Sequence, residues 1–425
     1  MKKILIITYY WPPKGGVGVQ RWLKLAKYLD RAGYDVTVYT AKDGITSVKD
    51  DKLTESVPNG ITVLERKIFE PQKLLKVFSK KTVSADYLMT KNNGPIKRLL
   101  YWIRANVFVP DSRAFWIKPS IRFLNKQLTE NPVDLVISTG PPHSMHLIAM
   151  GLVKKHPVKW VADFRDPWTN IVFFDNLPLM KFIVKKHKRL EKKVLTTADH
   201  LLTVSPSWGE DFKSMGANEV SVITNGFDPE DYVYPETKPQ PSEFKIGYFG
   251  LFNKDRDHSF FWEVLQEMRS ELPELEDDLK LFFSGEMHPE FFSTMKTLDL
   301  ENKLEYHTFM NHKDAICEMT QCDLLLVSQA EEKAINGRIP AKVFEYIGAK
   351  RPVLAIGEKG SDLEKILDDI SFGWFVGFGD KTAMKEAILA IYQLRTSSEG
   401  FDDAISKYSR ELQAKQVVEL FDSLK

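Results

Sequence analysis

Short apolar runs rich in branched residues recur along most of the chain. Runs of this length, bounded by turn residues, are typical of strands buried on both faces of a parallel sheet. In the first half they are Lys2–Thr8, Asp35–Thr40, Val133–Thr139, Lys159–Asp163, Asp199–Val204 and Val220–Thr224. In the second half they are Phe244–Gly250, the segments near 279–284 and 322–327, and Val353–Ile356.

Segments with helical periodicity separate these runs. Residues 19–31 carry Trp22, Leu23, Ala26 and Leu29 on one helical face. Further helices are expected after 146 to about 155, and over 178–196, 257–271, 289–298, 312–320 and 401–424. Regular strand–helix alternation predicts an α/β protein with doubly wound parallel sheets.

The chain is long enough for two such domains. It has 425 residues, 43% of them hydrophobic and 28% charged, as expected for a globular chain of two domains. Pro235, Pro239 and Pro241 mark a stiff linker. The predicted domains are therefore 1–235, 243–400, and a terminal helix in 401–425.

The loop and helix over residues 336–355 form the stretch around which the second domain is organised. Pro340 suits a first helical turn, and Gly348 with Pro352 ends the helix before the strand at Val353. The helix N-terminus favours an anion, and the cations Arg338 and Lys342 flank it. Glu345, one turn later, is placed to accept hydrogen bonds from hydroxyls. An anion plus a diol describes a nucleotide or a nucleotide sugar.

Polar groups follow three predicted strands of the first domain. Gly15, Gly16 and Gly18 follow the first strand and allow a tight turn close to a ligand. Carboxyl ends of parallel strands meet at one edge of a sheet, so these groups are expected to converge. The other members are His143 and His146 after one strand, and Asp163, Arg165 and Asp166 after the next. The spacing of the glycines is neither GxGxxG nor a Walker loop.

Two readings remain open for these polar groups. Each histidine either acts directly on a ligand or is a satisfied structural residue. Arg165 and Asp166 either contact an acceptor or form a pair that braces the loop.

Charge is divided unequally between the two halves. Residues 1–200 carry 35 Lys and Arg against 17 Asp and Glu, whereas residues 201–425 carry 24 against 41. A basic half favours an anionic partner such as a membrane surface. The alternative is a solvated surface that attracts the acidic half. No nucleic-acid reading motif accompanies the cations, so no nucleic-acid partner is expected.

Residues 178–196 are expected to form a strongly basic amphipathic helix, and an irregular insertion at about 66–126 interleaves basic residues with aromatics. Examples in the insertion are Lys73–Lys81, Ile96–Arg104 and Phe115–Lys118. Such segments suit an interfacial surface facing anionic lipid. The alternative is a helical insertion that packs Trp102 and Trp116 into the core.

The amino-terminal run and the cysteines add little chemistry. The run from Met1 is too short for a signal peptide and meets two prolines instead of a cleavage site, so we read it as a strand. No stretch approaches 18 apolar residues, so no membrane span is expected. Cys317 and Cys322 are expected to be reduced. A cytoplasmic protein, peripheral on the inner membrane face, is the expected localisation.

Several motifs in this order resemble the retaining glycosyltransferases of the GT-B fold in the GT4 family. The resemblance covers nearly the whole chain, and it is closest to enzymes that build bacterial surface polysaccharides. The motifs are Pro12–Gly18, Ser138–His146, Asp163–Trp168, Asn225–Asp228, Tyr248–Gly250, Arg338–Tyr346 and Arg351–Val353. The fold it implies is two Rossmann-like domains facing across a cleft, with the C-terminal helix crossing back to the first domain.

The resemblance also implies roles for individual residues. Glu345 would bind the ribose hydroxyls of a nucleoside-diphosphate sugar. Lys254 and Arg256, together with Lys342 and Arg338, would hold the diphosphate, with Tyr248 and Gly250 beside them. Gly15 and Gly16 would approach the donor phosphate, and His143 or His146 would lie near the transferred sugar. Asp163, Arg165 and Asp166 would lie on the acceptor side.

One position departs from the family pattern. Many members carry a second glutamate eight residues before the ribose glutamate, and here that position is Gly337. The contact to the donor sugar is therefore missing or supplied by Asn336 or Arg338. Asp255 and Asp257 resemble a metal motif of the other glycosyltransferase fold, which lacks two Rossmann halves, so no metal cofactor is expected.

The sequence thus predicts transfer of a hexosyl group, with retention, from a nucleoside-diphosphate sugar to a hydroxyl of a lipid-linked or oligosaccharide acceptor. Two alternatives stay open. One is a nucleotide-sugar 2-epimerase, for which the loops at 15–18 and 140–146 lack carboxylates. The other is a degenerate scaffold that binds nucleotide sugar without transfer.

Overall fold

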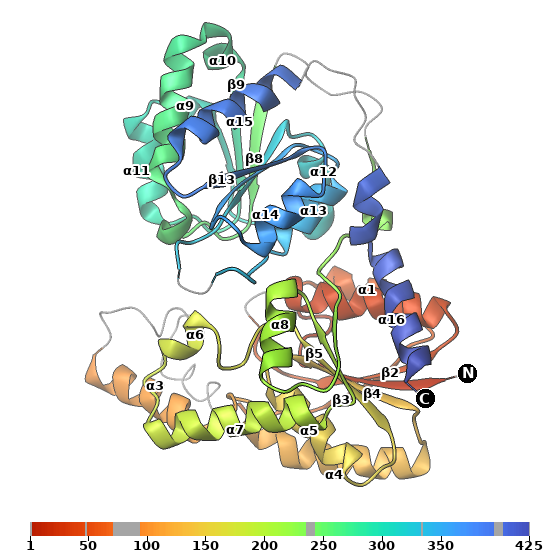
Figure 1. Ribbon diagram of the computed structural model, residues 1–425. Coiled ribbons are helices and arrows are strands. Elements are labelled where there is room, and N and C mark those ends of the chain that lie inside the picture. The colour runs from red at the N-terminus through yellow and green to blue at the C-terminus, as the bar shows by residue number, and fades with distance from the viewer. Residues whose placement is uncertain are drawn as a thin grey trace. The chain divides into compact units, whose positions relative to one another are not determined.

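The computed structural model describes residues 2–46, 49–70, 94–234, 243–332, 335–394 and 403–424. These residues form two compact units. Unit 1 comprises residues 1–224 and 414–425, and unit 2 comprises residues 225–413. The linker prolines and the segment Lys73–Lys81 lie outside the described residues. Each unit contains one parallel sheet with helices on both faces (Figure 1).

Unit 1 is built on a seven-stranded parallel sheet in the order β3-β2-β1-β4-β5-β6-β7. The chain therefore reverses its direction of winding between β1 and β4, which is a topological switch point. The strands are β1 Lys3–Ile7, β2 Asp35–Ala41, β3 Thr62–Arg66, β4 Leu135–Gly140, β5 Lys159–Phe164, β6 His200–Thr203 and β7 Val220–Val222. The helices are α1 Val17–Arg31, α3 Pro95–Val107, α4 Ala114–Glu130, α5 Ser144–Val153, α6 Val172–Asp175, α7 Lys181–Thr197 and α8 Pro206–Ser214.

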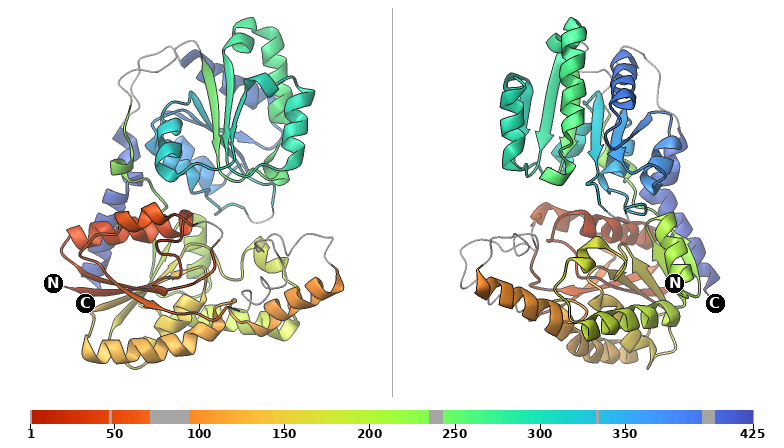
Figure 2. Two further views of the ribbon diagram at one scale, coloured as in Figure 1. Left: turned by 180° about the vertical axis from the view of Figure 1, so that it is seen from behind. Right: turned by 60° about the vertical axis from the view of Figure 1, so that its left-hand side comes forward.

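The alternation of side chains along β1 decides which helices cover which face. Leu5 and Ile7 belong to a core shared with α4, α5 and α7. Ile4 and Ile6 belong to the opposite core, which contains residues of α1 and of the C-terminal helix α16, Arg410–Ser423 (Figure 2). Within that core Phe421 of α16 is only 3% exposed. The predicted return of the terminal helix to the first domain is confirmed, although the helix begins at Arg410.

Unit 2 repeats the same strand order with six strands, β10-β9-β8-β11-β12-β13, and has its switch point between β8 and β11. The strands are β8 Phe244–Phe249, β9 Leu279–Ser284, β10 Leu304–His307, β11 Leu324–Ser328, β12 Val353–Gly357 and β13 Gly373–Gly377. The helices are α9 Ser259–Glu271, α10 Pro273–Asp278, α11 Pro289–Thr297, α12 His312–Met319, α13 Lys342–Gly348, α14 Asp362–Asp368 and α15 Lys381–Leu394. Two sheets with one topology confirm the predicted fold class.

Some predicted details were wrong. The helix in the 336–355 stretch has only seven residues and begins at Lys342, so Pro340 precedes it and is not in its first turn. Only one of the two tryptophans of the insertion packs into the core as its helical alternative required, because Trp116 is 2% exposed and stacks on Tyr39 whereas Trp102 is 39% exposed; the lipid-facing alternative stays a prediction. In the described part of the chain, no helix is long and apolar enough to cross a membrane.

Candidate active site

The strand β8 ends beside a buried amine in unit 2. Lys342 Nζ lies 3.7 Å from the centroid of the Tyr248 ring, and it is buried without a hydrogen-bond partner. Gly250 follows β8 with φ of +111°, and a Cβ there would lie 3.4 Å from this nitrogen. Glycine is therefore favoured twice at this position, by its backbone conformation and by the proximity of the amine.

Burial lowers the pKa of Lys342 well below its ordinary value, and the positive charge of Arg256 lowers it further. The carboxylate of Glu345 opposes the shift. A buried ammonium without a partner is costly, because it loses its hydration and gains no hydrogen bond in return. An anion bound here would supply the missing acceptor.

The two other predicted cations of unit 2 differ in their surroundings. Arg256 donates from Nη1 to the Leu251 carbonyl at 2.9 Å, which holds it near the end of β8. Lys254, in contrast, is 75% exposed and lies 3.7 Å from Glu290. The structure thus groups Arg256 with Lys342 and leaves Lys254 in a solvent-exposed ion pair. Tyr248 is wholly buried beneath Lys342, so its side chain positions the amine and does not reach a ligand.

Glu345 presents a partly exposed carboxylate from α13. Its Oε1 lies 3.2 Å from His312 Nε2, and about a quarter of its side chain is accessible. A hydrogen bond anchors the backbone of α13, because the Tyr232 hydroxyl donates to the Glu345 carbonyl at 2.8 Å. An anchored carboxylate facing solvent can accept hydrogen bonds from ligand hydroxyls.

The loop after β11 carries the remaining predicted donor residues. Arg338 Nη1 pairs with Glu332 Oε2 at 2.7 Å, and Gln329 Nε2 donates to the Arg338 carbonyl. Asn336 is exposed, whereas Gly337 is buried. The Oε1 of Gln329 is buried without a partner. Sequence reasoning missed Gln329 and Glu332, although the position of Gln329, directly after a buried strand, was a usable signal.

In unit 1 Asp163 has a structural role. It is fully buried at the end of β5 and accepts from Arg21 Nη2 at 3.1 Å, Trp22 Nε1 at 2.7 Å and Thr139 Oγ1 at 2.7 Å. Burial alone would raise its pKa, but Arg21 and these hydrogen bonds outweigh burial and lower it. With both oxygens occupied and no exposed surface, Asp163 does not contact an acceptor. Its predicted place on the acceptor side is corrected.

Arg165 braces two loops through backbone carbonyls, while its pairing with Asp166 stays a prediction. Its guanidinium donates to the carbonyls of Gly18, Gly140 and Pro141 and so ties the glycine-rich loop to the loop after β4. Asp166 is half-buried next to it in the sequence. Gly16, within the glycine-rich loop, has φ of +92°, a conformation that favours glycine.

The two candidate histidines are not equivalent. His146 is 0% exposed, stacks on Phe164 and bonds Ser138 Oγ through Nδ1 at 2.8 Å. Burial lowers the pKa of His146 to about 3, so the ring is neutral at pH 7. His143 is only half-buried and stacks in parallel on Trp168 with ring centroids 4.8 Å apart. Only His143 retains surface with which to contact a substrate.

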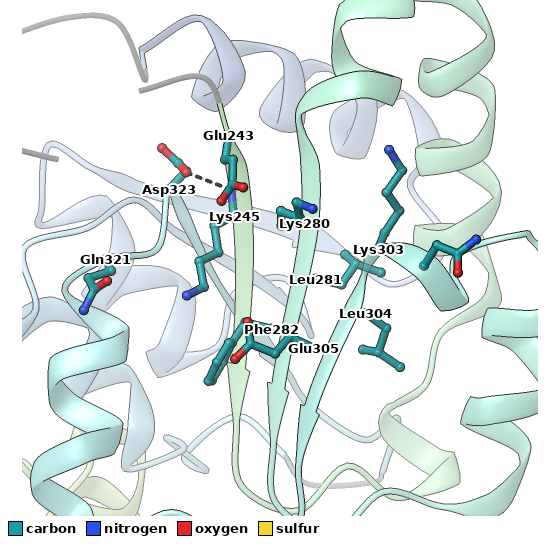
Figure 3. A pocket seen from close by; sticks show the side chains of 11 residues that line it. Glu243, Lys245, Lys280, Leu281, Phe282, Lys303, Leu304, Glu305, Gln321 and Asp323 are labelled. Carbon is teal, nitrogen blue, oxygen red and sulfur yellow. Dashed lines mark hydrogen bonds between the residues drawn. The ribbon is translucent and has the colours of Figure 1, made fainter. Parts of the chain in front are cut away.

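Unit 2 also contains a pocket of about 340 Å³ at the opposite end of its sheet (Figure 3). It lies where β8, β9 and β10 begin, whereas Lys342, Arg256 and Gly250 lie beyond the end of β8. Its Lys245 is paired, with Nζ 2.8 Å from Glu318 Oε2. None of the predicted site residues lines this pocket.

The residues that resemble a metal motif, Asp255 and Asp257, lie in and directly after a short 3-10 helix that follows β8. Asp257 accepts from Trp262 Nε1 at 2.5 Å and lies 2.8 Å from His288 Nε2. Within the described ranges, no three His, Cys, Asp or Glu residues are grouped so as to hold a metal ion.

Two doubly wound sheets of identical strand order, one of which places cations and a carboxylate beyond its switch point, define a protein of the GT-B architecture. Comparison with protein families gives the same class. The model of Glycosyltransferase Family 4 matches residues 15–231, which is half of the chain. The chain belongs to this family.

Individual relatives are more distant. A "probable glycosyltransferase WbjE" of Pseudomonas aeruginosa is 33% identical over 82 residues, which cover 19% of this chain and 20% of that protein. The match therefore spans about a fifth of the relative's length.

Solved structures are similar in fold over nearly their whole length. Sucrose-phosphate synthase from Thermosynechococcus elongatus has a TM-score of 0.64 at 13% identity and covers 100% of this chain and 99% of that one. S. aureus TarM, in a complex with Fondaparinux, alpha-GlcNAc-glycerol and UDP, has a TM-score of 0.64 at 12% identity, with coverage of 99% and 100%. At these identities the likeness concerns the fold alone.

Proposed function

We propose that the protein transfers a hexosyl group from a nucleoside-diphosphate sugar to an acceptor hydroxyl, with retention at the anomeric carbon. The observation that carries the proposal is the buried amine of Lys342, which has no hydrogen-bond partner and, when protonated, adds a positive charge beside Arg256. Because burying such a charge is unfavourable without a counter-ion, the site is suited to an anionic ligand. A diphosphate is an anion of the required charge.

The carboxylate of Glu345 extends the argument from an anion to a nucleotide. It lies one helical turn after Lys342 and is held by His312 at 3.2 Å. A ribose presents two adjacent hydroxyls, each of which can donate to a carboxylate oxygen. Lys342 and Glu345 on one short helix therefore match a phosphate and a ribose of the same molecule.

Catalysis, in this proposal, consists mainly of stabilising the leaving group. Negative charge develops on the diphosphate as the glycosidic bond breaks, and Lys342 and Arg256 are already in place to bind it. One such preorganised contact contributes about 3–4 kcal/mol. The acceptor hydroxyl attacks from the face that the diphosphate leaves, and its proton passes to the leaving phosphate. No protein nucleophile is needed in this scheme.

For the remaining predicted residues, the proposed contacts with the donor rest on the family resemblance. His143 and the loop at Gly15 and Gly16 contribute near the transferred sugar and its phosphate. Asn336 and Arg338 contact the donor sugar where Gly337 offers no side chain. Arg338 is already paired with Glu332, so either this pair opens or Asn336 makes the contact.

We propose a lipid-linked or oligosaccharide acceptor and a place in surface polysaccharide synthesis, with the protein peripheral on the cytoplasmic face of the membrane. The support is the similarity of the glycosyltransferase motifs and the excess of 35 Lys and Arg over 17 Asp and Glu in residues 1–200.

Two other functions fit the same fold. A nucleotide-sugar 2-epimerase would use carboxylates near the sugar for proton transfer, but Asp163, the buried carboxylate at the end of β5, is fully paired. A non-catalytic scaffold would bind the donor without turnover, and Gly337 is its support. Slow hydrolysis of the donor without an acceptor would favour the transferase over a scaffold, and a new sugar epimer would identify an epimerase.

The direct test is a thermal-shift screen of UDP-, GDP-, ADP- and dTDP-sugars. A ligand at about 100 times its dissociation constant adds roughly 2.7 kcal/mol to the free energy of unfolding. Glu345→Ala should remove the shift, whereas Lys254→Ala should retain it. If none of the four classes shifts the wild-type protein, the proposed function fails. EDTA should leave transfer unchanged, and restoration of lost activity by Mg²⁺ or Mn²⁺ would contradict the metal-free mechanism.

A further inference from the structure

Every charged side chain that the helix α7 exposes to solvent is cationic. Its only acidic residue, Glu191, is fully buried and accepts hydrogen bonds from Thr169 and from the Trp168 backbone. The opposite face packs inward through residues such as Ile183 and Val194. The exposed charged residues of the helix are Lys181, Lys185, Lys186, Lys188, Arg189, Lys192 and Lys193. No acid on the helix offsets these seven charges at the surface.

Exposed aromatic side chains accompany these cations. Phe182, in the first turn of α7, is 62% exposed, and Phe173 on α6 is 45% exposed. The neighbouring Phe174 is buried and lies 5.2 Å from the His187 ring of α7, which fixes α6 against the middle of that helix. Two large apolar side chains therefore stand at the border of the cationic face.

The helix α3 extends the same surface. Asn106 donates from Nδ2 to the carbonyls of Trp102 and Pro178, and its Oδ1 accepts from the Met180 backbone, so α3 is joined to the start of α7. Trp102 is 39% exposed and Leu99 is 57% exposed. All three helices lie together in both views of unit 1 (Figures 1 and 2). We call the seven cations of α7, with Leu99, Trp102, Phe173 and Phe182, the basic–aromatic surface.

We propose that the basic–aromatic surface docks the protein on an anionic lipid bilayer. Each Lys or Arg near such a bilayer is attracted by its negative surface potential, and aromatic side chains favour the interface between headgroups and acyl chains. A nucleic acid would match the charge. It would leave the aliphatic Leu99 without a partner, however, and α7 carries no Asn or Gln that could read bases. The inference deepens the proposed function, since it assigns the membrane contact to one surface of unit 1.

The test is flotation of the full chain with vesicles, without any substrate. We expect binding to vesicles of 70% phosphatidylcholine and 30% phosphatidylglycerol at 50 mM salt. We expect little binding to phosphatidylcholine alone, and release from the mixed vesicles at 500 mM salt, where the Debye length falls to a few ångströms. Equal binding to both vesicle types, or no binding to either, would overturn the proposal.

Two triple charge-reversal variants of the same design test whether the basic–aromatic surface is the part of the protein that binds vesicles. The variant K185E/R189E/K193E reverses three exposed cations spaced four residues apart on α7. The matched control K118E/R122E/K126E reverses the same residue types, with the same spacing, on α4. We expect the first to weaken vesicle binding on the order of 100-fold or more, and the second to have a much smaller effect. Equal losses would show a general attraction of the basic half and would overturn the assignment to α7.

The aromatic part is tested separately with F173S/F182S. We expect this variant to bind anionic vesicles several-fold more weakly than wild type, with its salt dependence unchanged because no charge is lost. A 40-nucleotide RNA at the same salt is the comparison ligand. Binding of RNA without binding of vesicles would replace the proposal with a nucleic-acid surface. The nucleotide-sugar thermal shift, measured on each variant without vesicles, reports the fold and the donor site independently of docking.

Discussion

The two sheets have the same strand order, but the polar groups beyond their strands differ in whether they have hydrogen-bond partners. In unit 1 the buried carboxylate of Asp163 pairs with Arg21, and the half-buried Arg165 donates to three carbonyls. In unit 2 the buried amine of Lys342 has no hydrogen-bond acceptor. The same topology thus supports a paired charge at Asp163 in one unit, here called the self-satisfied network, and an unpaired amine at Lys342 in the other, here called the incomplete network. The incomplete network is the better candidate for binding a charged ligand, because a ligand can complete it.

The self-satisfied network should be the more sensitive to loss of a charge. Asp163→Asn would leave Arg21 buried without a counter-ion, which typically costs about 3–5 kcal/mol. We expect urea unfolding to show a loss of this size, with little soluble protein at 37 °C. The double variant R21M/D163N should recover part of the loss, because it removes the stranded charge. A D163N variant with an unchanged free energy of unfolding would show that the Asp163–Arg21 pair does not stabilise the fold.

In the incomplete network, loss of the charged group should not lower the stability of the fold. Lys342→Met removes a buried, unpartnered amine, so we expect an unchanged or higher melting temperature without ligand. Transfer should nevertheless fall about 10²–10³-fold, as for the loss of one preorganised donor to a developing anion. The nucleotide-induced thermal shift should be lost as well. A destabilised K342M that still transfers at the wild-type rate would overturn the comparison.

The same lysine predicts a pH dependence of donor binding. A bound diphosphate favours the ammonium, whereas the empty site lowers its pKa. Binding should therefore take up a proton at alkaline pH, and affinity should fall as pH rises from that lowered pKa towards the ordinary value. Calorimetry in buffers of different ionisation enthalpy measures this uptake. Uptake should be absent in K342R, because its guanidinium stays charged in the empty site, and uptake in K342M equal to that of wild type would assign the proton elsewhere.

The buried histidines of unit 1 predict a smaller effect, on stability in acid. Burial lowers the pKa of His146 to about 3 and that of His187 to about 4. Because the unfolded chain binds these protons near pH 6.5, stability is complete above that value and falls as pH drops towards 3–4. Each histidine adds up to about 1.4 kcal/mol per pH unit. H146Q/H187Q should show a shallower decline in urea unfolding between pH 6.5 and 4.

The smallest effect on donor binding is expected for Lys254, the predicted cation that lies in a solvent-exposed ion pair and not beside Lys342. Lys254→Ala removes an exposed ion pair with Glu290, and such pairs contribute at most about 1 kcal/mol. Arg256→Ala should reduce donor affinity clearly more than Lys254→Ala does. Equal reductions would show that both cations reach the diphosphate once it is bound.

The sequence by itself determined the fold class and the location of its candidate chemistry. Apolar runs at β1, β4, β8 and β12 were long enough to be recognised, and the loops after them were expected at one edge of a sheet. The short strands β3, β10 and β13 were not predicted. They are edge strands of their sheets and include exposed or half-buried residues, so their hydrophobic signal is weak.

Only the tertiary structure decided which polar residues are available to a ligand. The sequence gives no reason to separate two sets of candidate site residues. One set is Asp163, Arg165 and His146, and the other is Lys342, Arg256 and Glu345. The first three are buried or bonded by groups that lie up to 147 residues away in the chain, such as Gly18 for Arg165. Local pattern carries the periodicity of strands and helices, but hydrogen-bond satisfaction depends on partners brought together by packing. That physical difference separates the residues that hold unit 1 together from those that unit 2 leaves for a substrate.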